Sequence, residues 1–206
     1  MQQINNDKRS RLAEHALFLK QVIRNPRAMG SIAPSTRYLS RVIGRLAATN
    51  LDGPVLEIGA GTGSFTRAMI KAGIDESRLH IVELNAGLCR HLQQQFPGAN
   101  VVHADATRLR DFLPRETIGE FLLVVSGLPL VNMPRHTSQA IISEIKACMA
   151  PEGRLLQFTY MPFSPIRVSR HALRGERIAW VLRNVPPATV WQYHNIGDSV
   201  DEAKSA

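Results

Sequence analysis

The sequence predicts an α/β fold in which a mostly parallel sheet of seven strands carries helices on both faces. Short apolar runs alternate with helical periodicity after residue 50, as expected for parallel strands joined by helical crossovers. Gly and Pro residues separate these elements. The last two runs adjoin across Pro186-Pro187 and should form an antiparallel pair. The length of 206 residues suits a single domain of this kind.

The expected strands are short and mostly apolar, and they occupy residues 54–60, 79–85, 101–106, 121–126, 154–160, 177–185 and 188–194. A helix is expected from Ser64 to Ala72, where Gly73 stops it. Two further helices are expected after the second and fourth strands, with inward-facing residues Leu88, Leu92, Phe96, Ile141, Ile142, Ile145 and Met149. Residues 151–153 should turn the chain into the fifth strand.

Composition excludes several classes of protein. Hydrophobic residues make up 44% and charged residues 20% of the chain, which excludes a disordered or collagen-like protein. The longest apolar run, residues 121–133, is too short and too interrupted to span a bilayer. Cys89 and Cys148 form no spacing motif, which argues against a disulfide framework or a metal site and favours a reducing cytoplasm.

The positive charge is concentrated ahead of the first strand. Residues 1–50 contain nine basic and two acidic side chains, whereas the rest of the chain is nearly balanced. This imbalance indicates a polyanionic partner, either nucleic acid or an anionic membrane surface. We therefore divide the chain into a basic amphipathic segment (1–50), a ligand-binding core (51–195) and a polar tail (196–206).

Two amphipathic helices are predicted within the basic segment. The first runs from Lys8 to Arg24, and the second begins near Pro34-Ser35. In the second, one face carries apolar residues and another carries arginines, namely Leu39, Val42, Ile43 and Leu46 against Arg37, Arg41 and Arg45. Such helices either lie in a membrane interface or pack on the sheet with their arginines in water, and the pattern leaves both open.

A glycine-rich turn closes the first strand and opens a helix, which is the setting of a nucleotide-binding loop. It contains Glu57, Gly59, Ala60, Gly61 and Gly63. Glu83 closes the second expected strand, where a carboxylate can accept hydrogen bonds from ribose hydroxyls. Asp105, followed by Ala106, closes the third and is placed to accept from an adenine amino group. Open α/β sheets bind ligands at these carboxyl ends.

The spacing Glu57-x-Gly-x-Gly-x-Gly63 differs from the dinucleotide fingerprint and resembles the first motif of class I S-adenosylmethionine-dependent methyltransferases. The resemblance implies a Rossmann-like, seven-stranded sheet whose final strand is antiparallel. It also implies S-adenosylmethionine as cofactor and S-adenosylhomocysteine as product. In that family the glycine loop meets the methionyl part, the acid on the second strand holds the ribose, and the Asp on the third faces adenine. Ala60, Ala106 and Ser126 are expected beside the same cofactor.

Ser126-Gly-Leu-Pro129-Leu130 follows the fourth strand. The chain resembles the rRNA adenine dimethyltransferases in order and size, and these enzymes carry Asn/Asp-x-Pro-Tyr/Phe at this place. Ser126 replaces the Asn/Asp and Leu130 replaces the aromatic residue. A flipped adenine would lose a stacking contribution of about 1–3 kcal/mol. RNA is therefore a disfavoured substrate, although an rRNA adenine N6-dimethyltransferase remains the alternative interpretation.

Four further blocks resemble the soluble bacterial phospholipid N-methyltransferases over about residues 15–194, and they lie at residues 18–35, 125–129, 157–160 and 183–191. The resemblance implies stepwise methylation of phosphatidylethanolamine to phosphatidylcholine by a cytoplasmic enzyme held peripherally on the inner face of the membrane. Lys20, Arg24 and Arg27 would then meet anionic lipid, at about 1 kcal/mol each near the surface.

The candidate acceptor residues are few. Ser126 is expected to orient the amine. Tyr160 either orients it too or simply packs on the core, and Tyr38 is a further candidate for facing methylated cations. Arg183 either holds a lipid phosphate or is a solvated surface residue. We expect no DNA partner and no metal, and the oligomeric state stays open.

Overall fold

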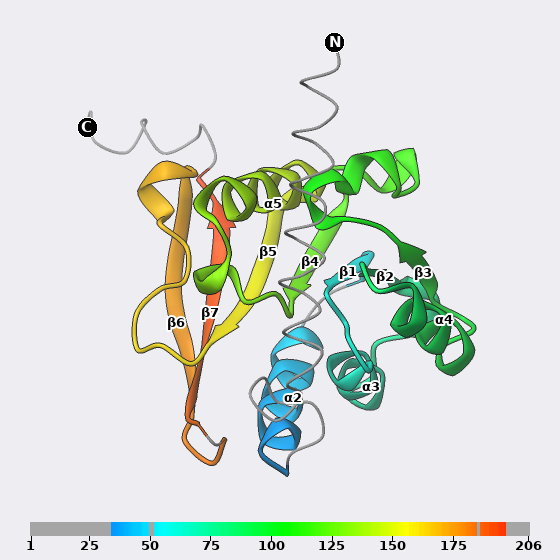
Figure 1. Ribbon diagram of the computed structural model, residues 1–206, viewed down its shortest axis with the longest axis horizontal. Coiled ribbons are helices and arrows are strands. Elements are labelled where there is room, and N and C mark those ends of the chain that lie inside the picture. Colours follow the sequence, from blue (N-terminus) through cyan, green and yellow to red (C-terminus); the bar gives the residue numbers. More distant parts are fainter. Residues whose placement is uncertain (1–33, 50–51, 185, 197–206) are drawn as a thin grey trace.

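All seven predicted strands pair into one sheet (Figure 1). The computed structural model describes residues 34–49, 52–184 and 186–196. The strands are β1 (Val55–Ile58), β2 (Leu79–Glu83), β3 (Asn100–His103), β4 (Phe121–Ser126), β5 (Met149–Thr159), β6 (Leu173–Val181) and β7 (Ala188–Asn195). Their order is β3-β2-β1-β4-β5-β7-β6. Only β7 runs antiparallel to its neighbours, β5 and β6, which confirms the predicted fold class.

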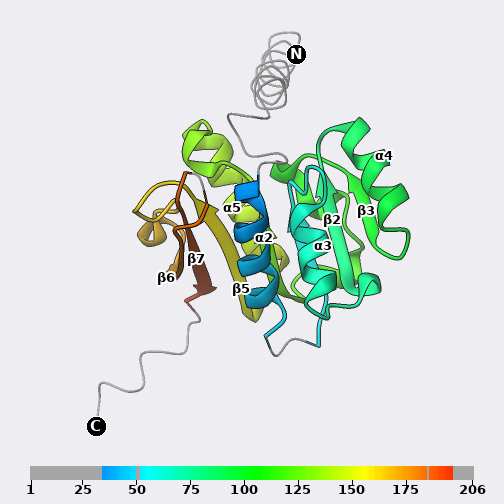
Figure 2. The same cartoon turned by 90° about the horizontal axis from the view of Figure 1, so that it is seen from below.

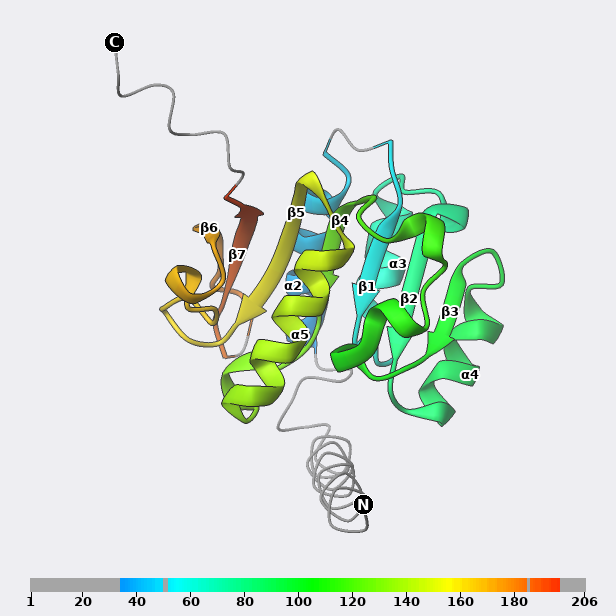
Figure 3. The same ribbon diagram turned by 90° about the horizontal axis from the view of Figure 1, so that it is seen from above.

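Helices cover both faces of the sheet and make three layers (Figures 2 and 3). One face packs against α2 (Pro34–Ala47), α3 (Ser64–Lys71) and α4 (Ala86–Gln95). The other face packs against α5 (Arg135–Cys148). Short 3-10 turns complete the described chain, namely η1 (Glu76–Arg78), η2 (Ala106–Asp111), η3 (Arg115–Thr117), η4 (Leu130–Asn132) and η5 (Val168–Arg170). Because alternate strand residues enter opposite core layers, the central strands are apolar on both faces.

Helix α2 packs on the protein rather than standing apart from it. Leu39 and Ile43 are buried, whereas the three arginines on its other face are exposed. At Gly44 the helix crosses α3 so closely that an added Cβ would lie 2.4 Å from the Ala68 carbonyl oxygen. For this helix the packing interpretation is correct. The first predicted helix, with Lys20 and Arg24, lies outside the described residues, as do Arg27 and the tail from residue 197.

The ends of most strands differ from the prediction, and β1 and β2 each end two residues earlier than expected. β3 stops at His103, because the Asp105 carboxylate accepts a hydrogen bond from the Thr107 N–H (2.9 Å) and starts η2 instead. β5 begins at Met149, so the expected turn at residues 151–153 lies inside a strand whose pairing with β4 shifts register. β5 also ends at Thr159, so that Tyr160 follows the strand instead of closing it.

β6 begins four residues before the prediction and also ends four residues earlier, at residues 173 and 181 rather than 177 and 185. Its first half contains Arg174, Glu176 and Arg177, all exposed. These charges suit an edge strand, which has water on its free side, but they hide the apolar alternation on which the prediction depended.

Candidate cofactor and acceptor site

The glycine-rich loop is fixed to the neighbouring strand and leaves open space at its tip. The Gly59 N–H donates to the Val82 carbonyl oxygen (2.8 Å), which ties the start of the loop to β2. Gly61 has a φ of +59°, in the left-handed region that favours glycine, and a Cβ added there would meet nothing within 4 Å. Ala60, between them, is buried. The loop therefore presents bare backbone outward, as contact with a ligand requires.

Glu83 closes β2, as predicted, and its carboxylate holds the loop in place. One oxygen accepts the Gly61 N–H (2.9 Å) and the other accepts the Asn85 N–H (2.8 Å). The side chain is buried. A carboxylate oxygen has two acceptor positions, so each oxygen retains capacity for a ligand hydroxyl. The residue that would hold a ribose thus also positions the glycine loop.

Glu57 lies inside β1 and is fully buried. Its Oε2 accepts a hydrogen bond from the Thr66 hydroxyl of α3 (2.6 Å), whereas its Oε1 has no partner among the described residues. Burial raises the pKa of Glu57 to about 7, against the opposing effect of the Thr66 hydrogen bond, and the nearby Glu83 carboxylate raises it further. A buried oxygen without a partner fits a site that gains a cationic or hydrogen-bonding ligand group.

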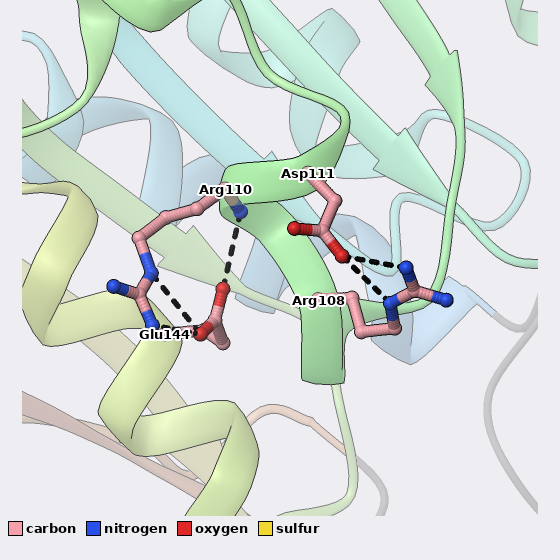
Figure 4. Close-up of polar contacts among 4 residues, drawn as sticks. All are labelled: Arg108, Arg110, Asp111 and Glu144. Atoms are coloured by element: carbon pink, nitrogen blue, oxygen red, sulfur yellow. Dashed lines mark hydrogen bonds and ion pairs between the residues drawn. The ribbon is translucent and has the colours of Figure 1, made fainter.

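Asp105 and the buried Ala106 follow β3 at the same edge, because the Ala104 N–H donates to the Glu83 carbonyl oxygen. The η2 turn that follows them is fixed to α5, as Figure 4 shows. Glu144 accepts from the Arg110 guanidinium (2.7 Å) and from the Arg110 N–H (3.1 Å). Burial alone would raise the pKa of Glu144, but these hydrogen bonds from Arg110 lower it below its ordinary value.

The predicted acceptor loop leaves β4 at Ser126, whose side chain is buried. Ser126 pairs in register with Ile58 and with Gln157, which lie on the two neighbouring strands. The Gly127 N–H donates to the Ile58 carbonyl oxygen (2.8 Å), and a Cβ on Gly127 would lie 2.6 Å from the Gly59 carbonyl oxygen. The acceptor loop and the glycine loop are therefore in direct contact.

Tyr160, Tyr38 and Arg183 are all exposed. The Tyr160 ring meets Phe158 edge to face at 5.6 Å, and Phe158 meets Phe65 of α3 in the same way. Partial burial raises the pKa of the Tyr160 phenol, and a hydrogen bond with the Asn184 side chain has a smaller opposing effect. No hydrogen bond or ring contact joins Tyr38 or Arg183 to Ser126 among the described residues, so their predicted roles rest on the sequence alone.

Two site residues escaped the sequence analysis. Thr66 supplies the hydroxyl bonded to Glu57. Gln157 is buried in β5, and its amide donates to the Leu128 carbonyl oxygen of the acceptor loop (3.0 Å), while its own Oε1 has no partner among the described residues. Gln157 could have been recognised from the sequence, because it lies inside the apolar run Leu155–Phe158 and a buried side-chain amide requires hydrogen-bond partners.

The bare glycine backbone, the Glu83 carboxylate with its spare acceptor capacity, the Asp105 carboxylate and the unpartnered oxygen of Glu57 thus lie toward one sheet edge. Together they fit a nucleoside that carries an amino acid tail. Residues 55–153 match the family model described as a methyltransferase domain. The core of the chain thus matches the methyltransferase domain family, and its seven-stranded sheet has the fold of the class I S-adenosylmethionine-dependent methyltransferases.

Comparison with curated proteins shows a relative of similar length. The chain is 29% identical over 186 residues to the ornithine lipid N-methyltransferase of Singulisphaera acidiphila, covering 89% of this chain and 97% of that protein. It is also 37% identical over 76 residues to the ribosomal RNA small subunit methyltransferase A of Erythrobacter litoralis, which covers 36% of this chain and 26% of the relative.

A solved structure shows the same fold. The 1,6-didemethyltoxoflavin-N1-methyltransferase of Burkholderia thailandensis, crystallised with S-adenosylhomocysteine, has a TM-score of 0.67 and 16% identity, with 90% of each chain covered. In the part of the chain that the structure describes, no helix is long and apolar enough to cross a membrane. The same residues contain no cluster of His, Cys, Asp and Glu suited to a metal ion.

Proposed function

We propose that this methyltransferase transfers methyl groups to the primary amine of a lipid headgroup, namely phosphatidylethanolamine in successive steps toward phosphatidylcholine. The observation that carries the proposal is the similarity to a lipid N-methyltransferase, because it extends over 89% of this chain and nearly all of that relative. The similarity to the ribosomal RNA enzyme is confined to about a third of the chain, and favours that function only as the second candidate.

The acceptor loop supports the same choice. Leu130 takes the place where a base-stacking aromatic ring would be expected, and its side chain is buried in the core below β4. A flipped adenine would find no ring there, whereas a small aliphatic amine needs none. Ser126 offers a hydroxyl at the end of β4, and its only hydrogen bond in the described chain is a long one from the Leu128 N–H (3.4 Å). That hydroxyl is available to orient an amine.

The reaction is a displacement at carbon. S-adenosylmethionine, when bound, supplies a methyl group on a positively charged sulfur. The lipid ammonium would lose one proton to solvent before each transfer, and its neutral nitrogen would then accept the methyl group while the donor leaves as S-adenosylhomocysteine. Glu57, Gly61, Glu83 and Asp105 would hold the donor at the sheet edge. Ser126 would hold the amine, so that alignment supplies much of the rate.

The test is methyl transfer from labelled S-adenosylmethionine to vesicles that contain phosphatidylethanolamine, ornithine lipid or neither, with deproteinised ribosomal RNA in a parallel reaction. We expect label in mono-, di- and trimethylated phosphatidylethanolamine. Label in ornithine lipid alone would keep the lipid class and correct the headgroup. Label in RNA alone would overturn the proposal. The Glu83→Ala variant serves as the control for cofactor-dependent transfer.

A further inference from the structure

An exposed apolar and aromatic surface lies beside the acceptor end of the sheet. We call it the β6 patch and define it by Met161 and Phe163 from the β5–β6 loop, Trp180 at the end of β6, and Leu182 after it. Phe163 is 54%, Trp180 49% and Leu182 70% exposed. Single exposed apolar side chains are ordinary, but a contiguous group marks an interaction surface.

Several contacts hold these residues together. The Arg177 guanidinium lies 4.5 Å from the centre of the Trp180 ring and donates to the Pro162 carbonyl oxygen (3.2 Å), which joins the loop to β6. The Thr189 hydroxyl donates to the Met161 carbonyl oxygen (3.0 Å), and Thr189 pairs in register with Trp180. The loop is therefore fastened across β7, with Phe163 and Trp180 exposed on one connected surface.

The patch adjoins the acceptor site. Thr189 also pairs in register with Thr159, the last residue of β5, and Tyr160 follows it. β5 and β6 are both antiparallel to β7, so they run parallel to each other and end at the same edge as β4. A partner that binds the β6 patch thus lies at the same edge of the sheet as Ser126, the last residue of β4.

The charge of this region is complementary to an anionic surface. Residues 160–187 contain five basic residues and one acidic residue, namely Arg167, Arg170, Arg174, Arg177 and Arg183 against Glu176. All five arginines are exposed, but only two lie at the patch, since Arg177 stacks on Trp180 and Arg183 follows Leu182. Arg174 pairs in register with His194, at the opposite edge of the sheet. Trp, Phe and Leu side chains with Arg177 and Arg183 beside them suit the boundary between lipid headgroups and acyl chains, where aromatic rings insert and cations meet phosphate.

We propose that the β6 patch docks on an anionic phospholipid bilayer and thereby holds the acceptor end of the sheet against the membrane. This inference rests on the proposed function, since a lipid amine must reach Ser126 while its acyl chains stay in the bilayer. It assigns membrane contact to the folded core itself, in addition to the basic N-terminal segment expected from the sequence.

Tryptophan fluorescence gives a test specific to this patch. The chain has two tryptophans, Trp180 and Trp191, so that the N-terminal 50 residues contribute no tryptophan signal. The Trp191→Phe variant reports Trp180 alone. The vesicles contain phosphatidylglycerol and brominated phosphatidylcholine, and therefore no primary amine. We expect a blue shift of the emission and quenching by bromine. Unchanged emission from protein that sediments with the vesicles would overturn the proposal, as would failure to sediment.

Variants test the energetics. Phe163→Ser with Leu182→Ser should lower partition into the vesicles about tenfold or more, because both side chains leave water on docking. Ile196→Ser is the matched control, since Ile196 is also 54% exposed but follows β7 at the opposite edge of the sheet. Unchanged S-adenosylhomocysteine binding shows that each variant is folded. Equal losses in the double variant and the control would contradict the assignment.

A second substrate separates this proposal from the proposed function. A short-chain phosphatidylethanolamine, kept below its micelle concentration, reaches the acceptor site without a bilayer. We expect the double variant to methylate it at the wild-type rate while losing activity on vesicles. If the wild type does not methylate it, the proposed function fails while the fluorescence result still decides docking. A Trp180 response to RNA without one to vesicles would overturn the membrane assignment.

Discussion

The Glu83 carboxylate accepts the Gly61 N–H across 2.9 Å, so the residue expected to bind ribose also fixes the loop expected to contact the methionyl part. One side chain thereby organises two sections of the proposed cofactor site before any ligand arrives. Preorganisation of this kind reduces the entropy lost on binding.

Replacing Glu83 with Gln should weaken cofactor binding strongly. The amide nitrogen cannot accept either of the two backbone N–H groups that the carboxylate holds. Loss of a charge-assisted bond costs about 1.5–3 kcal/mol, which corresponds to roughly a 10- to 100-fold higher dissociation constant. Titration calorimetry with S-adenosylhomocysteine measures this dissociation constant. Glu76→Gln is the control, because Glu76 holds the Gly98 N–H in a distant loop, and equal effects would contradict the assignment.

Because of Glu57, the unliganded protein should become less stable as the pH rises. Its folded pKa of about 7 exceeds the ordinary 4.5, so between these values the folded chain keeps a proton that the unfolded chain has lost. The free energy of unfolding then decreases as the pH rises through this window, by on the order of 3 kcal/mol in total. Denaturant unfolding at about pH 5 and about pH 8 tests this dependence.

Two variants control this measurement. Glu57→Gln has no titrating group and should remove the decrease, whereas Thr66→Val removes the hydrogen bond that opposes the shift and should extend the decrease to higher pH. A wild type and a Glu57→Gln variant with parallel pH profiles would contradict the assignment.

Glu144→Ala should loosen the turn that follows Asp105. Glu144 is the α5 side of the contact with Arg110, and both its oxygens are used. We expect faster hydrogen exchange in η2 and a several-fold weaker affinity for S-adenosylhomocysteine. The matched control is Asp111→Ala, which removes the Arg108–Asp111 pair, exposed at 65% and 54% (Figure 4). Exposed pairs contribute little, so the control should behave as wild type.

Ser126→Ala should lower turnover of the lipid amine while leaving cofactor affinity nearly unchanged. One lost hydrogen bond is worth about 0.5–1.5 kcal/mol, or roughly a two- to tenfold fall in kcat/KM. Initial rates on the short-chain lipid give the value. Ser138→Ala, on the exposed start of α5, is the control. An unchanged rate would remove Ser126 from the acceptor site.

Gly44→Ala should destabilise the protein, although the same change in an open helix is stabilising by about 1 kcal/mol. The new Cβ would lie 2.4 Å from the Ala68 carbonyl oxygen, so α2 and α3 must separate. Overpacking of this kind costs roughly 1–3 kcal/mol. Thermal unfolding measures the sign, and a higher Tm would show that the two helices pack less closely than the structure indicates.

The order of elements and the positions of Glu57 and Glu83 in the sheet were predictable because their signals are local. Glu57 and Glu83 lie in apolar runs that end at glycine or a helix cap, so sequence alone places Glu57 near the end of β1 and Glu83 at the end of β2. The Thr66–Glu57 and Arg110–Glu144 contacts depend on helices docking against the sheet, and the second pair is 34 residues apart. The limits of β6 were predicted wrongly because the exposed charged residues of this edge strand interrupt the apolar alternation that indicates a strand.

That edge has a consequence for the protein in concentrated solution. β6 is one of the two edge strands of the sheet, so its free backbone groups offer a template on which another chain could add a strand and begin an aggregate. The irregular register between Arg177 and Ala179 breaks the template midway, and the charges at Arg174 and Glu176 line its first half. The bulge and the charged side chains thus protect the exposed edge of the sheet from pairing with a strand of another molecule.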